Sequence, residues 1–184
     1  ACILGLGGVI VVNMVFAAAA YSGYDVAPTN NINIIAHRGD AVSAPENTIP
    51  AIENAISAGA DYAEIDVQLT ADGVVVLTHD SNLKRMTGQD VDVDKTNYDE
   101  IAKLDASGDF KNEYPNTKIP TLEEVMKVAD GKIKLFIELK PTEGTEKELI
   151  AKTVKLIEDN NFMDQCAVQS LDYKLIEGVK EVNK

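Results

Sequence analysis

The sequence has few basic residues for its size. It contains 17 Lys and Arg residues against 30 Asp and Glu residues, for a formal net charge of -13. Because Lys and Arg side chains hold the phosphate backbone of nucleic acids, this balance argues against a nucleic-acid partner. A small substrate that carries phosphate would need local positive charge, from a metal ion or from a few placed cations.

Cysteine and histidine are also scarce, with two residues of each. Cys2 and Cys166 lie near opposite ends of the chain, so the sequence predicts no disulfide framework. No cluster of Cys and His is present, and zinc is therefore the less favoured metal.

Residues 1–24 contain no charged side chain, and residues 1–20 are apolar apart from Asn13 and a few small residues. Twenty such residues can cross a bilayer as a helix, which is the structure we expect. A secretory signal with its cleavage region at 17–20 and a buried core helix are the alternatives. The chain starts with Ala and lacks a basic stretch here, so we expect further sequence upstream. No Lys or Arg precedes Arg38, and the pattern does not predict an orientation.

Residues 25–32 are expected to form a linker and residues 33–184 a soluble domain. Apolar runs predict strands at 33–36, 62–69, 74–78, 134–139 and 166–170. Capping residues and helical spacing predict helices from Thr48 to Gly59, at 121–129, at 145–160 and at 172–182. Strands that alternate with helices predict a parallel sheet. Residues 81–115 have weak periodicity and are expected to leave this scaffold as an excursion, with at most a short helix at 98–103.

Both histidines follow an apolar run. His37 ends the run 34–36 and is followed by Arg38 and Gly39, while His79 ends the run 74–78 and is followed by Asp80. In parallel α/β folds, residues at the carboxyl ends of the strands build the active site. We therefore interpret the two histidines as site residues.

Carboxylates occupy two of the predicted strands. Glu64 and Asp66 are two residues apart, so both side chains project from the same face. Paired carboxylates among apolar neighbours are costly unless a cation binds them. Glu138 lies in a later strand, with Lys140 on the same side. Three carboxylates from two strands suit a hard cation such as Mg²⁺ or Ca²⁺.

These groups fit a single reaction. A divalent cation can hold the anionic oxygens of a phosphodiester and polarise its phosphorus, while the two histidines move protons. Arg38 adds a planar pair of donors for a phosphate oxygen. The residues therefore predict metal-assisted cleavage of a phosphodiester.

Five short motifs in this order resemble those of the glycerophosphodiester phosphodiesterases, and the resemblance extends over about residues 33–184. They are His37-Arg38-Gly39, Pro45-Glu46-Asn47-Thr48, Glu64-Ile65-Asp66-Val67, His79-Asp80 and Glu138-Leu139-Lys140. The resemblance implies an α/β fold, the TIM (β/α)8 barrel of the phospholipase-C-like phosphodiesterases, with about the first five β/α units present. It also implies a hydrolase that converts glycerophosphodiesters to glycerol 3-phosphate and an alcohol.

The same resemblance implies roles for individual residues. It implies His37 and His79 as the acid/base pair, and Glu64, Asp66 and Glu138 as ligands of one divalent cation, Mg²⁺ or Ca²⁺. It implies Arg38 and Lys140 as phosphate contacts, and it places Glu46 in the wall of the site. The excursion at 81–115 resembles the small insertion that this family has after its second histidine, and the last three strands of the family lie beyond this chain.

Several alternatives stay open at this point. Arg38 and Lys140 can be salt-bridge partners of the carboxylates, Glu46 can be a helix-start charge, and Asp80 can orient His79 or begin a turn. A phospholipase-D-like enzyme acting on lysophospholipid or sphingomyelin is the second hypothesis, and a non-catalytic binding domain is the third. Because some bacterial relatives carry membrane segments, we expect a membrane-associated enzyme with an extracytoplasmic catalytic domain at the bacterial cell surface.

Overall fold

The computed structural model describes residues 32–182. The apolar segment expected at 1–24, and the predicted linker up to residue 31, lie outside the described residues. Between residues 32 and 182, no helix combines the length and the apolar character that a membrane span requires. Residues 33–184 form one compact unit, and the elements below belong to it.

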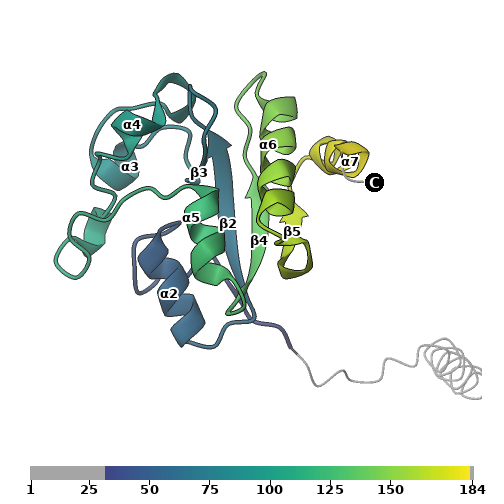
Figure 1. Ribbon diagram of the computed structural model, residues 1–184. Helices are drawn as coiled ribbons and strands as arrows, with labels where there is room; N and C mark the ends of the chain where they lie inside the picture. Colours follow the sequence, from purple (N-terminus) through teal and green to yellow (C-terminus); the bar gives the residue numbers. More distant parts are fainter. Residues whose placement is uncertain (1–31, 183–184) are drawn as a thin grey trace, which may run out of the picture. The chain divides into compact units, whose positions relative to one another are not determined.

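The elements keep the labels of Figure 1. The strands are β1 (Ile35–Ala36), β2 (Tyr62–Leu69), β3 (Val75–Leu77), β4 (Lys134–Leu139) and β5 (Cys166–Gln169). The α-helices are α2 (Ile49–Ser57), α3 (Lys84–Thr87), α4 (Tyr98–Ile101), α5 (Leu122–Ala129), α6 (Glu146–Asp159) and α7 (Tyr173–Val182). Short 3₁₀ turns lie at η1 (Val93–Lys95), η2 (Gly108–Phe110) and η3 (Met163–Gln165). All four long helices predicted from the sequence are confirmed, with ends within two residues of the expected ones.

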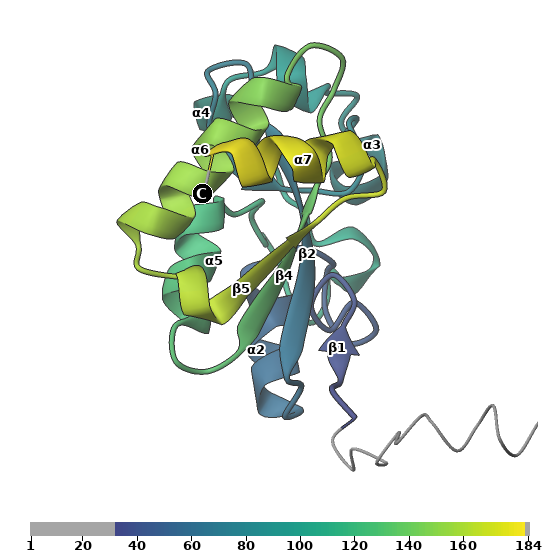
Figure 2. The ribbon, with the colours of Figure 1, turned by 90° about the vertical axis from the view of Figure 1, so that its right-hand side faces the viewer.

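The strands β1, β2, β4 and β5 lie side by side in that order, and each neighbouring pair is parallel. The register places Ile65 opposite Ile137 and Asp66 opposite Glu138. In Figure 2 these four strands run in the same direction, so their carboxyl ends meet at one edge. The sheet therefore gathers residues from distant parts of the chain at that edge.

The strand β3 corrects one expectation, because it pairs with β2 in the antiparallel direction. The connection between β2 and β3 is a tight turn, closed by the N–H of Gly73 donating to the carbonyl of Thr70 at 2.9 Å. A parallel partner would need a crossover of a dozen or more residues, which this turn cannot supply. The described residues thus contain four parallel strands, and His79 follows a strand that returns toward the middle of β2.

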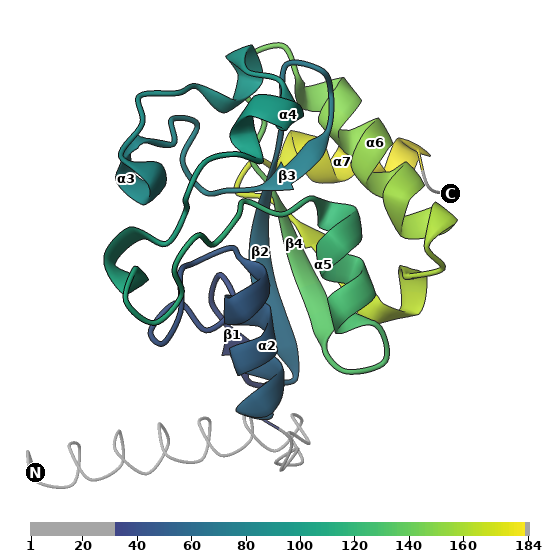
Figure 3. The same cartoon turned by 60° about the vertical axis from the view of Figure 1, so that its left-hand side comes forward.

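The core forms between the sheet and the helices α2, α5 and α6, which Figure 3 shows in front of the strands. Odd-numbered residues of β2 and β4, such as Ile65 and Ile137, are fully buried against these helices. Even-numbered residues alternate to the opposite face, as strand geometry requires. The helix α5 begins with a capping box, in which Thr121 and Glu124 each bond the backbone of the other.

The excursion after β3 packs against that strand around a second, small core. This core consists of Val76, Leu83, Met86, Val93, Ile101, Ala106 and Ile119. Figures 1 and 3 show α3 and α4 together on the side of the sheet toward which β2 points. The excursion therefore folds as a packed subregion next to the carboxyl ends of the strands.

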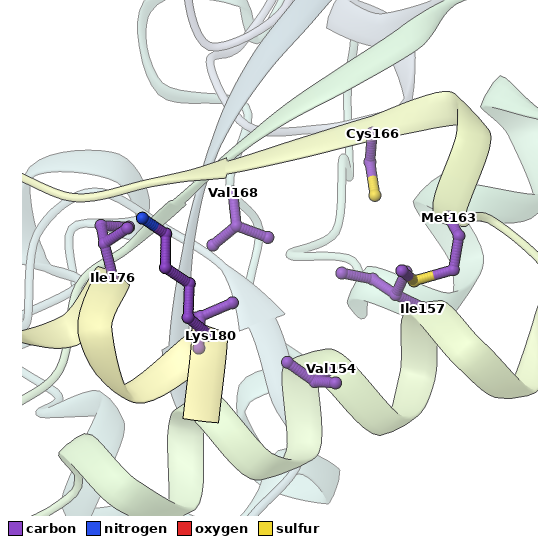
Figure 4. Close-up of a pocket in the computed structure, with 8 residues that line it drawn as sticks. Val154, Ile157, Met163, Cys166, Val168, Ile176 and Lys180 are labelled. Carbon is purple, nitrogen blue, oxygen red and sulfur yellow. The ribbon is translucent and has the colours of Figure 1, made fainter. Parts of the chain in front are cut away.

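An apolar pocket of about 300 Å³ lies between β5, α6 and α7. Figure 4 shows Val168 and Cys166 from the strand facing Val154 and Ile157 of α6. Burial raises the pKa of the Cys166 thiol to about 11, so the thiol stays protonated near neutral pH. Among the described residues, Lys180 is the one charged residue in the lining of this pocket, which contains no carboxylate and no histidine. Cys166 is not an activated nucleophile.

The burial of the sheet leads to a stability prediction. Replacement of the fully buried Ile137 by Ala should lower the free energy of unfolding by about 2–5 kcal/mol, because it removes apolar contact and leaves a cavity. Val42→Ala is the control, since Val42 is 88% exposed and its change should stay within about 0.5 kcal/mol. Urea unfolding of the full-length protein measures both, and equal effects would contradict the assignment of this core.

Candidate active site

Three carboxylates meet at the carboxyl edge of the sheet. Glu64 and Asp66 come from β2 and Glu138 from β4, and one oxygen atom of each lies within 4.8 Å of the other two. The parallel register brings them together, because Asp66 is directly opposite Glu138. Glu64 and Asp66 are buried, with exposed fractions of 6% and 1%. The structure thus assembles the three residues predicted as cation ligands.

The electrostatics of this cluster favour a bound cation. Burial is the main cause that raises the pKa of Glu64, and the negative charges of Asp66 and Glu138 raise it further. The Oε1 atom of Glu64 is buried and has no hydrogen-bond partner. Hard carboxylate oxygens are the donors that Mg²⁺ and Ca²⁺ prefer. The three side chains can therefore hold a divalent cation, which would satisfy the unpartnered oxygen.

Two basic side chains contact the carboxylates. The Nε atom of Arg38 lies 3.5 Å from Asp66 Oδ2, and Lys140 Nζ lies 2.8 Å from Glu138 Oε1 and 3.5 Å from Asp66 Oδ1. Burial alone would lower the pKa of Lys140, but the hydrogen bond with Glu138 and the charge of Asp66 raise it overall. Lys140 therefore stays cationic. The salt-bridge alternative for Arg38 and Lys140 describes these contacts.

The turn after β1 has an uncommon backbone. Arg38 and Gly39 both have positive φ angles, of 55° and 74°. This conformation directs the N–H of Arg38 to Glu64 Oε2, at 3.0 Å. It also brings Gly39 against helix α2, where a Cβ atom would lie 2.8 Å from the carbonyl carbon of Ala51. His37, with 73% of its side chain exposed, has Nε2 at 3.8 Å from Glu64 Oε2.

The second histidine is held from two sides. Asp80 Oδ1 lies 2.9 Å from His79 Nδ1, which leaves Nε2 of the ring free. Gln68, on the inner face of β2, donates from Nε2 to the carbonyl of Thr78 at 3.1 Å and to that of His79 at 2.9 Å. Asp80 thus contacts the His79 ring and also lies in the bend at residues 79–81, so the structure is compatible with both of the roles considered for it.

His79 and Glu138 open onto a shared hollow of about 470 Å³. Its lining includes Gln68, His79, Glu138, Lys140 and Ser170. His37 is absent from this lining and stands beside Glu64. Of the three clustered carboxylates only Glu138 lines this hollow, together with Lys140, while Glu64 and Asp66 lie outside its lining.

Three polar residues around the site were given no catalytic or binding role from the sequence. Asn47 is fully buried and holds Asp66 twice, donating from Nδ2 to Oδ2 at 2.9 Å and accepting from the backbone N–H at 3.0 Å. Its only sequence signal is its place in the motif Pro45-Glu46-Asn47-Thr48. Gln68 follows Asp66 by two residues, and this spacing predicts that it shares the strand face of Glu64 and Asp66. Arg85, which contacts Glu46 and Asp80, lies in the excursion and had no local signal.

A model of the glycerophosphoryl diester phosphodiesterase family matches residues 37–177. The chain belongs to this family. It is 37% identical over 150 residues to a glycerophosphodiester phosphodiesterase of Caldanaerobacter subterraneus subsp. tengcongensis, a match that covers 81% of this chain and 62% of the relative.

Solved structures of phosphodiesterases resemble the fold of this chain. A phosphodiesterase of Oleispira antarctica, in complex with the product sn-glycerol-3-phosphate, has a TM-score of 0.79 and 36% identity over 83% of this chain and 62% of its own. A glycerophosphodiester phosphodiesterase of Agrobacterium tumefaciens has a TM-score of 0.75 and 31% identity, over 83% of this chain and 63% of its own. This chain spans about three fifths of the length of these relatives. The expectation of a partial TIM barrel is confirmed.

The close approach of Gly39 to α2 predicts that the stability of the protein is sensitive to a side chain at this position. Gly39→Ala should destabilise the protein more than Gly59→Ala, although both glycines have a φ angle of 74°. A Cβ atom at Gly59 meets nothing within 4 Å, so that variant measures only the cost of the left-handed conformation, about 1–2 kcal/mol. The added cost at Gly39 should be about 1–3 kcal/mol, because the backbone of Ala51 must move. Chemical unfolding measures both, and equal losses would contradict the packing of this turn.

The ion pairs of Glu46 predict a pH dependence. Burial raises the pKa of Glu46, but the hydrogen bond from Arg85 and the charges of both arginines outweigh it and hold the pKa below its ordinary 4.5. A carboxyl with a lowered pKa stabilises the folded state above pH 4.5 and loses that effect as the pH falls through the folded value. The difference in unfolding free energy between the wild type and Glu46→Gln should therefore shrink below pH 4.5. Glu53→Gln, at an exposed position, serves as the control. If the difference in unfolding free energy between the wild type and Glu46→Gln does not change with pH, the stabilising role of the Glu46 ion pairs is refuted.

Proposed function

We propose that the full-length protein hydrolyses glycerophosphodiesters to glycerol 3-phosphate and an alcohol. One observation carries this proposal. Three carboxylates, those of Glu64, Asp66 and Glu138, lie together at one edge of the sheet. Lys140 and His79 lie near Glu138, in a chain that belongs to the phosphodiesterase family. The relative from Oleispira antarctica was solved with sn-glycerol-3-phosphate, which supports the same product class here. In the reaction, the bond between phosphorus and the alcohol oxygen breaks and a water oxygen binds to phosphorus.

Glu64, Asp66 and Glu138 would hold one divalent cation, Mg²⁺ or Ca²⁺. When bound, the cation supplies positive charge that neutralises the phosphodiester and makes its phosphorus more electrophilic. Asn47 keeps Asp66 in place through its two hydrogen bonds. Arg38 and Lys140 flank the carboxylates and can donate to the remaining phosphate oxygens, which adds orientation as well as charge.

His37 and His79 would act as the acid/base pair. One ring takes a proton from the attacking water, and the other gives a proton to the departing alcohol oxygen. Asp80 fixes the ring of His79 through Nδ1, so that Nε2 is the atom available for the transfer. His37 needs no buried partner to exchange protons with water, since most of its side chain is exposed. The apolar stretch at residues 1–24 supports a membrane-associated enzyme. An extracytoplasmic catalytic domain is proposed from the resemblance to bacterial relatives, because this stretch sets no orientation.

The decisive experiment measures glycerol 3-phosphate released from glycerophosphocholine by the full-length protein. Release should stop with EDTA and return with Mg²⁺ or Ca²⁺. His79→Ala should reduce the rate about a hundredfold or more, because proton transfer typically contributes that much. Glu53→Gln, which alters an exposed position on α2, should keep the wild-type rate.

Two results would contradict the proposal. If the folded protein cleaves lysophosphatidylcholine and not glycerophosphocholine, the phospholipase-D-like hypothesis replaces it. If the protein binds glycerophosphocholine in the presence of either ion but forms no product over hours, the non-catalytic binding domain replaces it.

A further inference from the structure

Arg85 makes contacts that the proposed mechanism has not used. It lies on α3 in the excursion, and its guanidinium engages two carboxylates with all three nitrogens. Nε lies 2.6 Å from Asp80 Oδ2, while Nη2 and Nη1 lie 2.6 and 3.2 Å from the two oxygens of Glu46. Glu46 precedes Arg85 by 39 residues, so the contact joins separate parts of the chain.

Each carboxylate that Arg85 holds also contacts a predicted site residue. The second oxygen of Asp80 lies 2.9 Å from His79 Nδ1. Glu46 Oε1 accepts from Arg38 Nη1 at 2.9 Å, and Arg38 Nε in turn lies 3.5 Å from Asp66. A continuous network of charged contacts therefore runs from one histidine, through Arg85, to the carboxylate cluster.

We propose that Arg85 is a positioning residue of the hydrolase. It fixes Asp80 and Glu46 relative to each other, and these in turn set the direction of the His79 ring and of the Arg38 guanidinium. This proposal rests on the proposed function. It assigns to the excursion a part in the chemistry, which is to present Arg85 to two loops of the barrel.

The geometry requires arginine at this place. The planar guanidinium donates to both oxygens of Glu46 and to one of Asp80 at the same time. The ammonium group of a lysine is a compact charge and lacks the planar set of donors that this arrangement uses. The side chain of Arg85 is 52% exposed and those of Glu46 and Asp80 are 18% and 33% exposed, so these ion pairs lie at the surface on the side of Arg85, where such pairs typically contribute little to stability. Loss of this side chain should therefore affect the alignment of the site more than the folding of the protein.

The excursion has other attachments to the barrel. The Nδ2 atom of Asn54 donates to the hydroxyl of Tyr114 at 2.9 Å, and the N–H of Tyr98 donates to Asp72 at 3.0 Å. Leu83 and Met86 are both buried in the small apolar core that the excursion shares with Val76 of β3. The excursion can therefore stay docked without Arg85, and the effect of a substitution on the site can be measured separately.

The test uses the full-length protein with glycerophosphocholine and saturating Mg²⁺ or Ca²⁺. Arg85→Met should lower kcat about ten- to a hundredfold with KM within about threefold, because small displacements of catalytic groups slow the chemical step. Arg85→Lys keeps one charge and should give an intermediate kcat. Lys84→Met is the matched control, since Lys84 is the neighbouring exposed residue and pairs only with the exposed Asp90 among the ion pairs of the described residues. Its kcat should be that of the wild type, and thermal unfolding checks that all variants are folded.

A double-mutant cycle with Asp80→Asn separates positioning from a purely structural role. Because Arg85 acts partly through Asp80 and partly through Glu46, the loss of kcat caused by Arg85→Met should be at least about threefold smaller in the Asp80→Asn background than in the wild type. Independent multiplication of the two losses would overturn the proposal, as would a kcat of Arg85→Met within twofold of the wild type. A wild-type protein that releases no glycerol 3-phosphate would instead refute the proposed function, so the two failures are distinguishable.

Discussion

The structure depends on the placement of three negative charges on neighbouring parallel strands. Glu64, Asp66 and Glu138 are forced together by the register of β2 and β4, and two of them are buried. Such a cluster destabilises a fold unless positive charge compensates it. Lys140 and Arg38 supply part of that charge. The unpartnered oxygen of Glu64 leaves a place that a divalent cation fits.

The surrounding structure holds this cluster in place. The strained turn at Arg38 and Gly39 brings a backbone N–H to Glu64, and Asn47, also at positive φ, holds Asp66 from its other side. Strain of this kind persists where the neighbouring structure fixes the backbone, and it is common at functional sites. The stable core beneath, between the sheet and three helices, provides that fixation.

The sequence predicted much of this arrangement, because strand ends and alternation are local signals. Two-residue spacing placed Glu64 and Asp66 on one face, and the apolar runs located all five strands. The direction of β3 was not predicted, since an apolar run of that length fits either orientation. The contacts of Arg85 could not be predicted either, because they join an excursion of weak periodicity to a residue 39 positions earlier. Only the folded chain brings such residues together.

The most direct test of the carboxylate cluster is a calorimetric titration of Mg²⁺ and of Ca²⁺ into the metal-free, full-length protein. The wild type should bind one ion of at least one of the two metals at this cluster. Asp66→Asn should weaken that binding at least about tenfold, since it removes one charged ligand, while Glu53→Gln should leave it unchanged. Equal affinity in the wild type and Asp66→Asn, with both proteins folded, would contradict the assignment of this cluster as the metal site.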